Sequence, residues 1–190
     1  RSIVTPGTAT DELLLKETAD RTMVEACSDL VNECKTLAQQ LGTVLLKHQS
    51  VVATAESCTG GLIGGFITDI SGSSSWFDRG FITYTNKAKM ECLGVKAQTL
   101  DSFGAVSAET ANEMVLGALA HSDATIAVAV TGIAGPTGAV PGKPIGTVYF
   151  GFAIKGQRVT TVRQVFGGDR EQVRLQTVRY ALKTMISMYN

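Results

Sequence analysis

Residues 125–131 (TIAVAVT) are the clearest candidate for a buried strand, because small and β-branched apolar residues follow one another there without a charge. Residues 51–55 (VVATA) have the same character, and residues 80–85 (GFITYT) are a third candidate. The segments TVYFGFAI and RVTTVRQVF flank the turn Lys155-Gly156-Gln157 and predict a β-hairpin. Strands that alternate with helices and end in a hairpin predict an α/β fold. We expect a three-layer α/β/α sandwich with a mixed sheet, in a single domain.

A long helical pattern precedes the first strand. From Asp11 to about His48, apolar residues recur at spacings of three and four, which fits one long helix or two shorter ones. Residues 1–10 lack this period and are interpreted as a tail or arm. The apolar stripe must pack on something, and a face of the sheet is the expected surface. Its members are Leu30, Cys34, Leu37, Leu41, Val44 and Leu45.

Shorter helices are predicted between and after the strands. Residues 62–70 (LIGGFITDI) fit a helix, and residues 86–94 fit a short one that ends at Gly94. Ser107 is a good N-cap for the helix that follows it, and Asp169 begins a final amphipathic helix. The composition of the segments 71–75 and 132–146 indicates loops.

Charge and composition exclude several classes of protein. The 190 residues carry 17 Lys and Arg against 17 Asp and Glu, so the formal net charge is zero, without the basic cluster that a nucleic-acid protein needs. No apolar run approaches the roughly 18 residues that span a bilayer, and the amino end lacks the pattern of a secretory signal. We therefore expect a cytoplasmic protein with a small-molecule substrate, no nucleic-acid partner and no membrane contact. Whether it forms a homo-oligomer stays open.

Cysteine and histidine usage excludes further chemistries. The four cysteines form no C-x-x-C pair, and Cys27 and Cys34 are interpreted as buried apolar side chains rather than a disulfide. His48 and His121 each lie at an apparent helix end, where a cation favours the helix dipole. We therefore expect neither a metal site nor a Ser-His-Asp triad, so a hydrolase of this sequence would need another activating group.

The glycine-rich segments do not match the phosphate-binding motifs. GGLIGG lacks the G-x-G-x-x-G register, and GAVPGKP has no Ser or Thr after its lysine, so neither a Rossmann fingerprint nor a P-loop is present. Tyr84 and Lys87 are three residues apart, whereas the pair of a short-chain dehydrogenase is four apart. A nicotinamide-dependent dehydrogenase is therefore not expected.

Ser57, in TAESCTGG, is the strongest candidate nucleophile. It lies where a strand ends at about Ala55 and a helix begins near Gly60 or Gly61, beside N–H groups that the helix leaves unpaired. The amides of residues 58–61 could stabilise an oxyanion as a carbonyl is attacked. The sequence does not match the G-x-S-x-G motif of a nucleophile elbow, however, and the alternative role for Ser57 is a plain helix N-cap.

Three other segments carry candidate groups. Lys87 would activate Ser57 if burial lowered the pKa of its amine, and Tyr84 would relay a proton or orient that amine. The alternative to this catalytic role is that Lys87 and Lys89 are solvated charges at the start of a helix. Thr131 lies at the carboxyl end of the clearest strand, where ligand contacts are common. Arg170, one turn before Arg174, lies in the first turn of the last helix. Its positive charge is unfavourable at this end of the helix dipole, so a bound phosphate would explain an arginine at this position. The alternative is an ion pair on the surface.

Together these segments resemble the CinA C-terminal domain family, also known as nicotinamide-nucleotide amidohydrolase or NMN deamidase. The resemblance covers roughly residues 45–185. It is carried by AESCTGGLI, DISGSSSWFDRGFITYTNKAKMECLGV, FGAVSAETANEM, AVTGIAGPTG with KPIGTVYFG, and GDREQVR.

The resemblance implies a three-layer α/β/α domain that hydrolyses nicotinamide mononucleotide to nicotinate mononucleotide and ammonia, in pyridine nucleotide recycling. It implies Ser57 as nucleophile, Lys87 as general base and Tyr84 as its partner, with no metal or organic cofactor. The Ser57 loop would supply the oxyanion hole. The residues expected to bind substrate are Glu56, Cys58, Thr59, Gly60, Gly61, Thr131, Gly132 and Arg170.

Two departures from the family pattern are visible. Thr85 stands where relatives often have serine, and residues 1–30 lie outside the resemblance, so we divide the chain into an arm (1–30) and an amidohydrolase domain (31–190). Many relatives also carry a large domain that resembles molybdopterin-binding proteins, for which 190 residues leave no room; a stand-alone deamidase is expected. The alternative is a catalytically silent nucleotide-binding or assembly module, associated with competence or DNA damage. A DNA-uptake role would need a basic surface that the sequence lacks.

Overall fold

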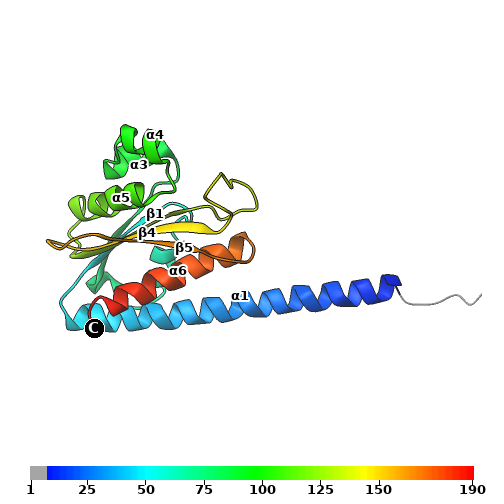
Figure 1. Cartoon of the computed structure of the whole chain (residues 1–190). Helices are drawn as coiled ribbons and strands as arrows, with labels where there is room; N and C mark the ends of the chain where they lie inside the picture. Colours follow the sequence, from blue (N-terminus) through cyan, green and yellow to red (C-terminus); the bar gives the residue numbers. More distant parts are fainter. Residues whose placement is uncertain (1–7) are drawn as a thin grey trace, which may run out of the picture.

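The computed structural model describes residues 8–190 and contains one five-stranded sheet, in the order β2-β1-β3-β4-β5 (Figure 1). β1 pairs in parallel with β2 on one side and β3 on the other, whereas β3–β4 and β4–β5 are antiparallel. The expected mixed sheet and the hairpin are therefore confirmed. The strands are β1 (Val52–Glu56), β2 (Phe77–Ile82), β3 (Ile126–Gly132), β4 (Thr147–Ile154) and β5 (Thr160–Val165).

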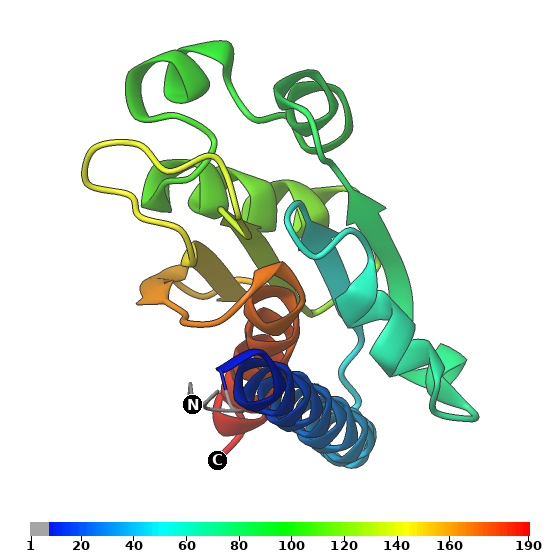
Figure 2. The same cartoon turned by 90° about the vertical axis from the view of Figure 1, so that its right-hand side faces the viewer.

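Helices cover both faces of this sheet, and Figure 2 shows the three layers from the side. One face carries α1 (Thr8–Lys47), α2 (Leu62–Thr68) and α6 (Arg170–Ser187). On the other, α5 (Ala108–Ala120) packs on the strands, and α3 (Asn86–Leu93) and α4 (Ala97–Phe103) pack against α5. The central strands β1 and β3 are buried on both sides, which fits sequences made mainly of small and β-branched apolar residues.

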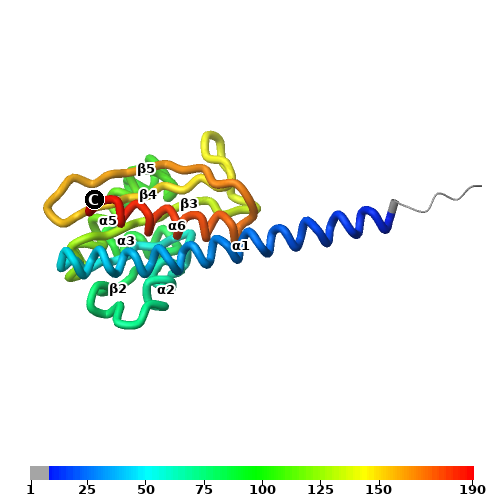
Figure 3. The backbone as a smooth tube through the Cα atoms, turned by 90° about the horizontal axis from the view of Figure 1, so that it is seen from below, coloured from blue at the N-terminus to red at the C-terminus, as the bar shows by residue number. Residues whose placement is uncertain are grey.

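The long helical pattern forms one continuous helix of 40 residues, α1. Its carboxyl half lies along α6, and its amino half projects beyond the sandwich (Figures 1 and 3). The expected division at residue 30 therefore falls inside a helix, and the first seven residues of the expected tail lie outside the described part. Large apolar side chains are exposed on the projecting half: Leu13, Leu14, Leu15, Met23 and Val24.

Helix ends follow the capping residues that the sequence shows. Ser107 accepts a hydrogen bond from the Thr110 amide at the start of α5, Asp169 forms a capping box at α6, and Gly94 ends α3 in the left-handed conformation. The four cysteines are free; Cys34 is buried, as expected, whereas Cys27 is only half-buried.

Two local expectations differ from the structure. The sequence predicts a strand at 80–85, whereas β2 begins at Phe77 and ends at Ile82. The strand cannot continue through residue 85, because the Thr85 side chain accepts a hydrogen bond from the Ala88 amide and caps the start of α3. The short helix α4 was not predicted. In the part of the chain that the structure describes, no helix combines the length and apolar character needed to cross a bilayer.

Candidate active site

Ser57 lies in the turn between β1 and α2, at the carboxyl edge of the parallel strands, as the sequence predicts. Its amide donates to the Val130 carbonyl of β3 over 3.0 Å, which fixes the residue to the edge of the sheet. Gly60 and Gly61 follow with φ of 59° and 101°, a left-handed conformation that glycine adopts without strain. The side chain of Ser57 is almost buried, and it lines a small hollow.

The amine that contacts Ser57 belongs to Lys89. Its Nζ lies 2.9 Å from the Ser57 Oγ and donates to the carbonyl oxygens of Thr83, over 2.8 Å, and Tyr84, over 3.2 Å. Lys89 is 1% exposed. Burial lowers the pKa of this amine from 10.5 to about 8, because the charged form loses its water. A neutral amine beside a serine hydroxyl is a general base in position.

The expectation that Lys87 lies beside Ser57 is wrong. The Lys87 side chain is 83% exposed, and its Nζ lies 3.6 Å from the Glu91 carboxylate in an i,i+4 pair on the surface of α3. Two residues apart on a helix are about 200° apart around its axis, so the two lysines of TNKAK cannot both face Ser57. Leu93, four residues after Lys89, is buried on the same face, and that spacing could have identified Lys89 from the sequence.

The backbone carbonyl of Tyr84 accepts a hydrogen bond from Lys89, whereas its phenol contacts Arg170. Tyr84 is 60% exposed, and its hydroxyl accepts a hydrogen bond from the Arg170 Nη2 over 3.1 Å. Arg170 also donates from Nη1 to the Gly135 carbonyl over 2.8 Å. The structure therefore brings Tyr84 and Arg170 together at the rim, but the phenol is not bonded to the amine that contacts Ser57.

The hollow at Ser57 has a volume of about 160 Å³. Thr131, at the end of β3, lies in its wall and donates its hydroxyl proton to the Ala105 carbonyl over 2.8 Å, so the lone pairs of the oxygen remain for a ligand. The predicted residues Cys58, Thr131, Gly132 and Arg170 are all present around it. The full lining is Ser57, Cys58, Tyr84, Lys89, Ala105, Val106, Thr131, Gly132, Ala134 and Arg170.

The side chains of Glu56 and Thr59 build the turn and do not line the hollow, so a direct substrate contact by the Glu56 carboxylate or the Thr59 hydroxyl, as expected from the sequence, is wrong. The Glu56 carboxylate is 1% exposed and accepts four hydrogen bonds, from the hydroxyls of Thr54 and Thr59 and from the amides of Ile63 and Gly64. The amides belong to the first turn of α2, whose unpaired N–H groups attract a negative charge. Thr59 is itself fully buried.

The glycines of the turn have different roles. The Gly60 amide donates to the Ser57 carbonyl over 3.0 Å, so it closes the turn and is not free for an oxyanion. A Cβ at Gly61 would lie 2.9 Å from the Ile82 Cδ1, so the turn passes close to the end of β2. Of the four amides expected to stabilise an oxyanion, those of Cys58, Thr59 and Gly61 stay as predictions.

The Cys58 thiol is a poor nucleophile, and the described residues contain no cluster of metal ligands. Burial raises the pKa of the Cys58 thiol to about 12, which keeps it protonated beside Ser57. Within residues 8–190, no group of three His, Cys, Asp or Glu side chains is arranged to hold a metal ion.

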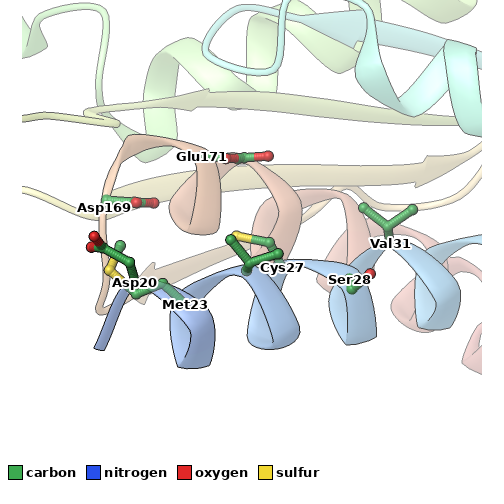
Figure 4. A pocket seen from close by; sticks show the side chains of 8 residues that line it. Asp20, Met23, Cys27, Ser28, Val31, Asp169 and Glu171 are labelled. Carbon is green, nitrogen blue, oxygen red and sulfur yellow. The ribbon is translucent and has the colours of Figure 1, made fainter. Parts of the chain in front are cut away.

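A larger hollow, of about 530 Å³, lies between α1 and the first turn of α6 (Figure 4). Its polar side chains are mainly the carboxylates of Asp20, Asp169 and Glu171. The pKa of the Cys27 thiol is raised, first by burial and then by the negative charges of Glu171 and Asp169. Its lining contains neither a lysine nor a histidine to act as base. We therefore identify the smaller hollow at Ser57 as the candidate active site, since nucleophile and base meet there.

Comparison with known proteins gives consistent results. The sequence matches the CinA C-terminal domain family over residues 34–189. The nicotinamide-nucleotide amidohydrolase PncC of Enterobacter agglomerans is 54% identical over 150 residues, which cover 79% of this chain and 92% of that protein. PncC of Escherichia coli strain K12 is 48% identical over 154 residues, covering 81% and 93%. The crystal structure of the competence/damage inducible protein CihA from Agrobacterium tumefaciens superposes with a TM-score of 0.81 at 46% identity, covering 83% of this chain and 96% of that one.

Proposed function

The chain belongs to the CinA C-terminal domain family, and two of its relatives are named nicotinamide-nucleotide amidohydrolases; we propose that it hydrolyses nicotinamide mononucleotide to nicotinate mononucleotide and ammonia. The observation that carries this proposal is the contact of 2.9 Å between the Ser57 hydroxyl and the buried Lys89 amine. This pair supplies both a nucleophile and a base for attack on a carboxamide.

The surroundings of Lys89 direct the lone pair of its neutral amine toward Ser57. A neutral amine has two N–H donors and one lone pair. The carbonyl oxygens of Thr83 and Tyr84 can only accept hydrogen bonds, so together they occupy both N–H donors of the Lys89 amine. The lone pair then faces the Ser57 hydroxyl, which donates its proton to it.

The reaction has two steps with the same base. Lys89 takes the Ser57 proton as the Oγ bonds to the carboxamide carbon, and the oxyanion forms against the amides of Cys58 and Thr59. The C–N bond then breaks, and the leaving nitrogen takes the proton from Lys89 and departs as ammonia. In the second step Lys89 takes a proton from water, whose oxygen attacks the acyl carbon and releases nicotinate mononucleotide. The proton returns to Ser57. The cycle requires neither a metal nor an organic cofactor.

Arg170 is proposed to bind the phosphate of the nucleotide. Its two bonds to Gly135 and Tyr84 use two of five donors and hold the guanidinium at the rim of the hollow. A charge-assisted contact with phosphate is worth roughly 1.5–3 kcal/mol. Arg170→Ala should therefore raise the KM for the mononucleotide about tenfold to a hundredfold and leave the KM for nicotinamide riboside nearly unchanged. Equal changes for both substrates would remove Arg170 from this role.

The decisive experiment measures ammonia release from nicotinamide mononucleotide by the wild type and by Ser57→Ala. The variant deletes one oxygen and leaves the backbone of the turn in place, so it should fold and bind the nucleotide, as calorimetry would show, but release ammonia several orders of magnitude more slowly. If the wild type binds the nucleotide without releasing ammonia, the chain is a silent binding module. If Ser57→Ala retains near-wild-type turnover, Ser57 is only a structural residue and a lysine-activated water is the better mechanism.

A further inference from the structure

Arg174, on α6, lies behind the turn that carries Ser57 and contacts it through two hydrogen bonds. Its Nε donates to the Cys58 carbonyl and its Nη2 to the Thr59 carbonyl, each over 3.1 Å. The side chain is partly buried, and among residues 8–190 no carboxylate forms an ion pair with it. The guanidinium is therefore directed at two consecutive carbonyl groups of the turn.

Binding these carbonyls also fixes the amides beside them. A peptide unit is planar and trans, so its N–H points opposite to its C=O. The bond from Arg174 to the Cys58 carbonyl therefore sets the direction of the Thr59 N–H. The bond to the Thr59 carbonyl sets the Gly60 N–H, which donates to the Ser57 carbonyl and closes the turn.

The turn needs such a restraint because two glycines follow the bonded carbonyls. Gly60 and Gly61 both have positive φ, and glycine loses more conformational freedom on folding than any other residue. Arg174 supplies the restraint from an 18-residue helix whose inner face, including Val173, Val178 and Leu182, is packed in the core. The guanidinium lies directly against the turn, since a Cβ at Gly60 would be 3.4 Å from its Nη2.

We propose that Arg174 is a positioning residue for the reaction: by holding the Cys58 carbonyl it keeps the Thr59 amide directed toward the developing oxyanion, and by holding the Thr59 carbonyl it keeps the Gly60 amide on the Ser57 carbonyl, which fixes the Cys58 amide in the same turn. The proposal rests on the proposed function, because it assigns the turn a role in the transition state. It concerns the amides and not the nucleotide, which distinguishes Arg174 from Arg170 one turn earlier.

The test compares kcat and KM for nicotinamide mononucleotide in four proteins: wild type, Arg174→Ala, Arg174→Lys and Arg179→Ala. Amides that act in the transition state change kcat with little effect on KM. Losing one such donor costs about 10²–10³ in kcat, so their misorientation in Arg174→Ala should lower kcat roughly tenfold to a hundredfold. Arg174→Lys keeps one donor and should recover part of the loss, as should millimolar guanidinium added to Arg174→Ala.

Arg179 provides a matched control on the same helix. Its guanidinium pairs with Glu33 of α1 over 3.1 Å, away from Ser57, so Arg179→Ala should retain the wild-type kcat. An unchanged kcat in Arg174→Ala, or a rise in KM alone, would overturn the proposal. A loss of kcat that neither the lysine variant nor guanidinium restores would do the same. If Arg174→Ala does not fold, Arg174→Gln replaces it.

A second readout separates this proposal from the proposed function. Amide hydrogen exchange at residues 58–61 needs no substrate, and it should be faster in Arg174→Ala than in Arg179→Ala. If the wild type releases no ammonia, the proposed function fails, and this exchange still decides whether Arg174 orders the turn. Equal exchange in the two variants would overturn the positioning role.

Discussion

At the scale of single residues, Lys87 and Lys89 show how the phase of a helix separates two identical side chains. Both lie in the same short motif, and both belong to α3, the helix that follows β2 at the edge of the sheet where Ser57 lies. α3 begins at Asn86, and this start places Lys89 on the buried face with Leu93 and Lys87 on the solvent face with Glu91. The chemistry of the pair therefore depends on where the helix begins.

The two lysines offer a direct comparison for catalysis. Lys89→Met removes the base while keeping a side chain of similar length, and general-base catalysis contributes about 10²–10⁴-fold. We expect kcat/KM for ammonia release from nicotinamide mononucleotide to fall by that factor. Lys87→Met removes an exposed charge in an i,i+4 pair and should leave kcat/KM within about twofold. Retained activity in Lys89→Met, with loss in Lys87→Met, would restore the role first expected for Lys87.

The lowered pKa of Lys89 predicts how activity depends on pH. Only the neutral amine accepts the Ser57 proton, and with a pKa of about 8 it is protonated in acid. The value of kcat/KM should therefore rise with pH and level off above about pH 8, falling about tenfold per pH unit below it. A profile without a limb near pH 8 would exclude Lys89 as the titrating base.

Stability should report the same pKa independently of turnover. The folded-state pKa of about 8 lies below the ordinary 10.5, so the stabilisation from this group is fully present above pH 10.5 and is lost as the pH falls toward 8. Relative to Lys89→Met, the free energy of unfolding of the wild type should rise by roughly 3 kcal/mol between these limits. Denaturant titrations of both proteins across this range measure the difference, and parallel curves would contradict it.

At the scale of elements, α2 depends on a carboxylate outside itself. α2 has seven residues, and Gly61, which precedes it, offers no side chain to its N-terminus. Glu56, from β1, accepts the Ile63 amide over 2.8 Å and the Gly64 amide over 3.1 Å instead. One buried side chain thus links the strand, the turn of Ser57 and the helix.

Glu56→Gln tests this link with almost no change in volume. The amide group would turn one N–H donor toward the donors that the carboxylate now satisfies, which costs about 1–3 kcal/mol for an unsatisfied buried group. We expect a lower Tm and also a lower kcat, because the Ser57 turn would shift. Thermal unfolding and ammonia release measure both effects.

Glu113→Gln is the matched control for this change. The Glu113 carboxylate accepts the Lys96 amide and the Thr99 hydroxyl at the start of α4, away from the Ser57 turn. This variant should lower Tm and leave kcat unchanged. Equal kcat losses in the two variants would show that reduced stability alone, and not the link to the turn, explains the effect of Glu56→Gln.

Local sequence patterns predicted most of these elements because their signals are local. The runs of β1 and β3, the hairpin of β4 and β5, and the caps at Ser107 and Asp169 each lie within a few residues. α4 has no such signal: its N-cap Lys96 forms no side-chain capping bond, and its cap comes from Glu113, 17 residues later. A pattern read along the chain does not contain that contact.

At the scale of the whole molecule, the site could be predicted only in part. Ser57, Thr131 and Arg170 were predicted because each stands at the end of a strand or the start of a helix, and such ends meet at one edge of the sheet. The resemblance to the family places Glu56 among the ligand-binding residues, next to Ser57 and Cys58. The alternation of a strand sends its side chain to the α2 layer instead. Arg174 acts through backbone carbonyls, which no residue pattern displays.

The projecting half of α1 leads to the last prediction. Side chains 9–25 are all exposed, whereas Cys34, Ala38 and Leu41 are fully buried in the core shared with α6. An unpacked helix of this length is only marginally stable in water, so it contributes little to the folding free energy. A chain that begins at residue 27 should therefore keep its Tm within about 2 °C and retain its kcat/KM.

A chain that begins at residue 42 is the contrast, since it also loses the three buried side chains. Burying an apolar side chain contributes roughly 1.5–3 kcal/mol for a large residue, so this deletion should cost several kcal/mol. For a domain of this size each kcal/mol shifts Tm by about 2–4 °C, and a drop of at least 10 °C is expected. If the shorter deletion alone removed activity while Tm held, the projecting half would act on the site at Ser57 and not merely extend from the fold.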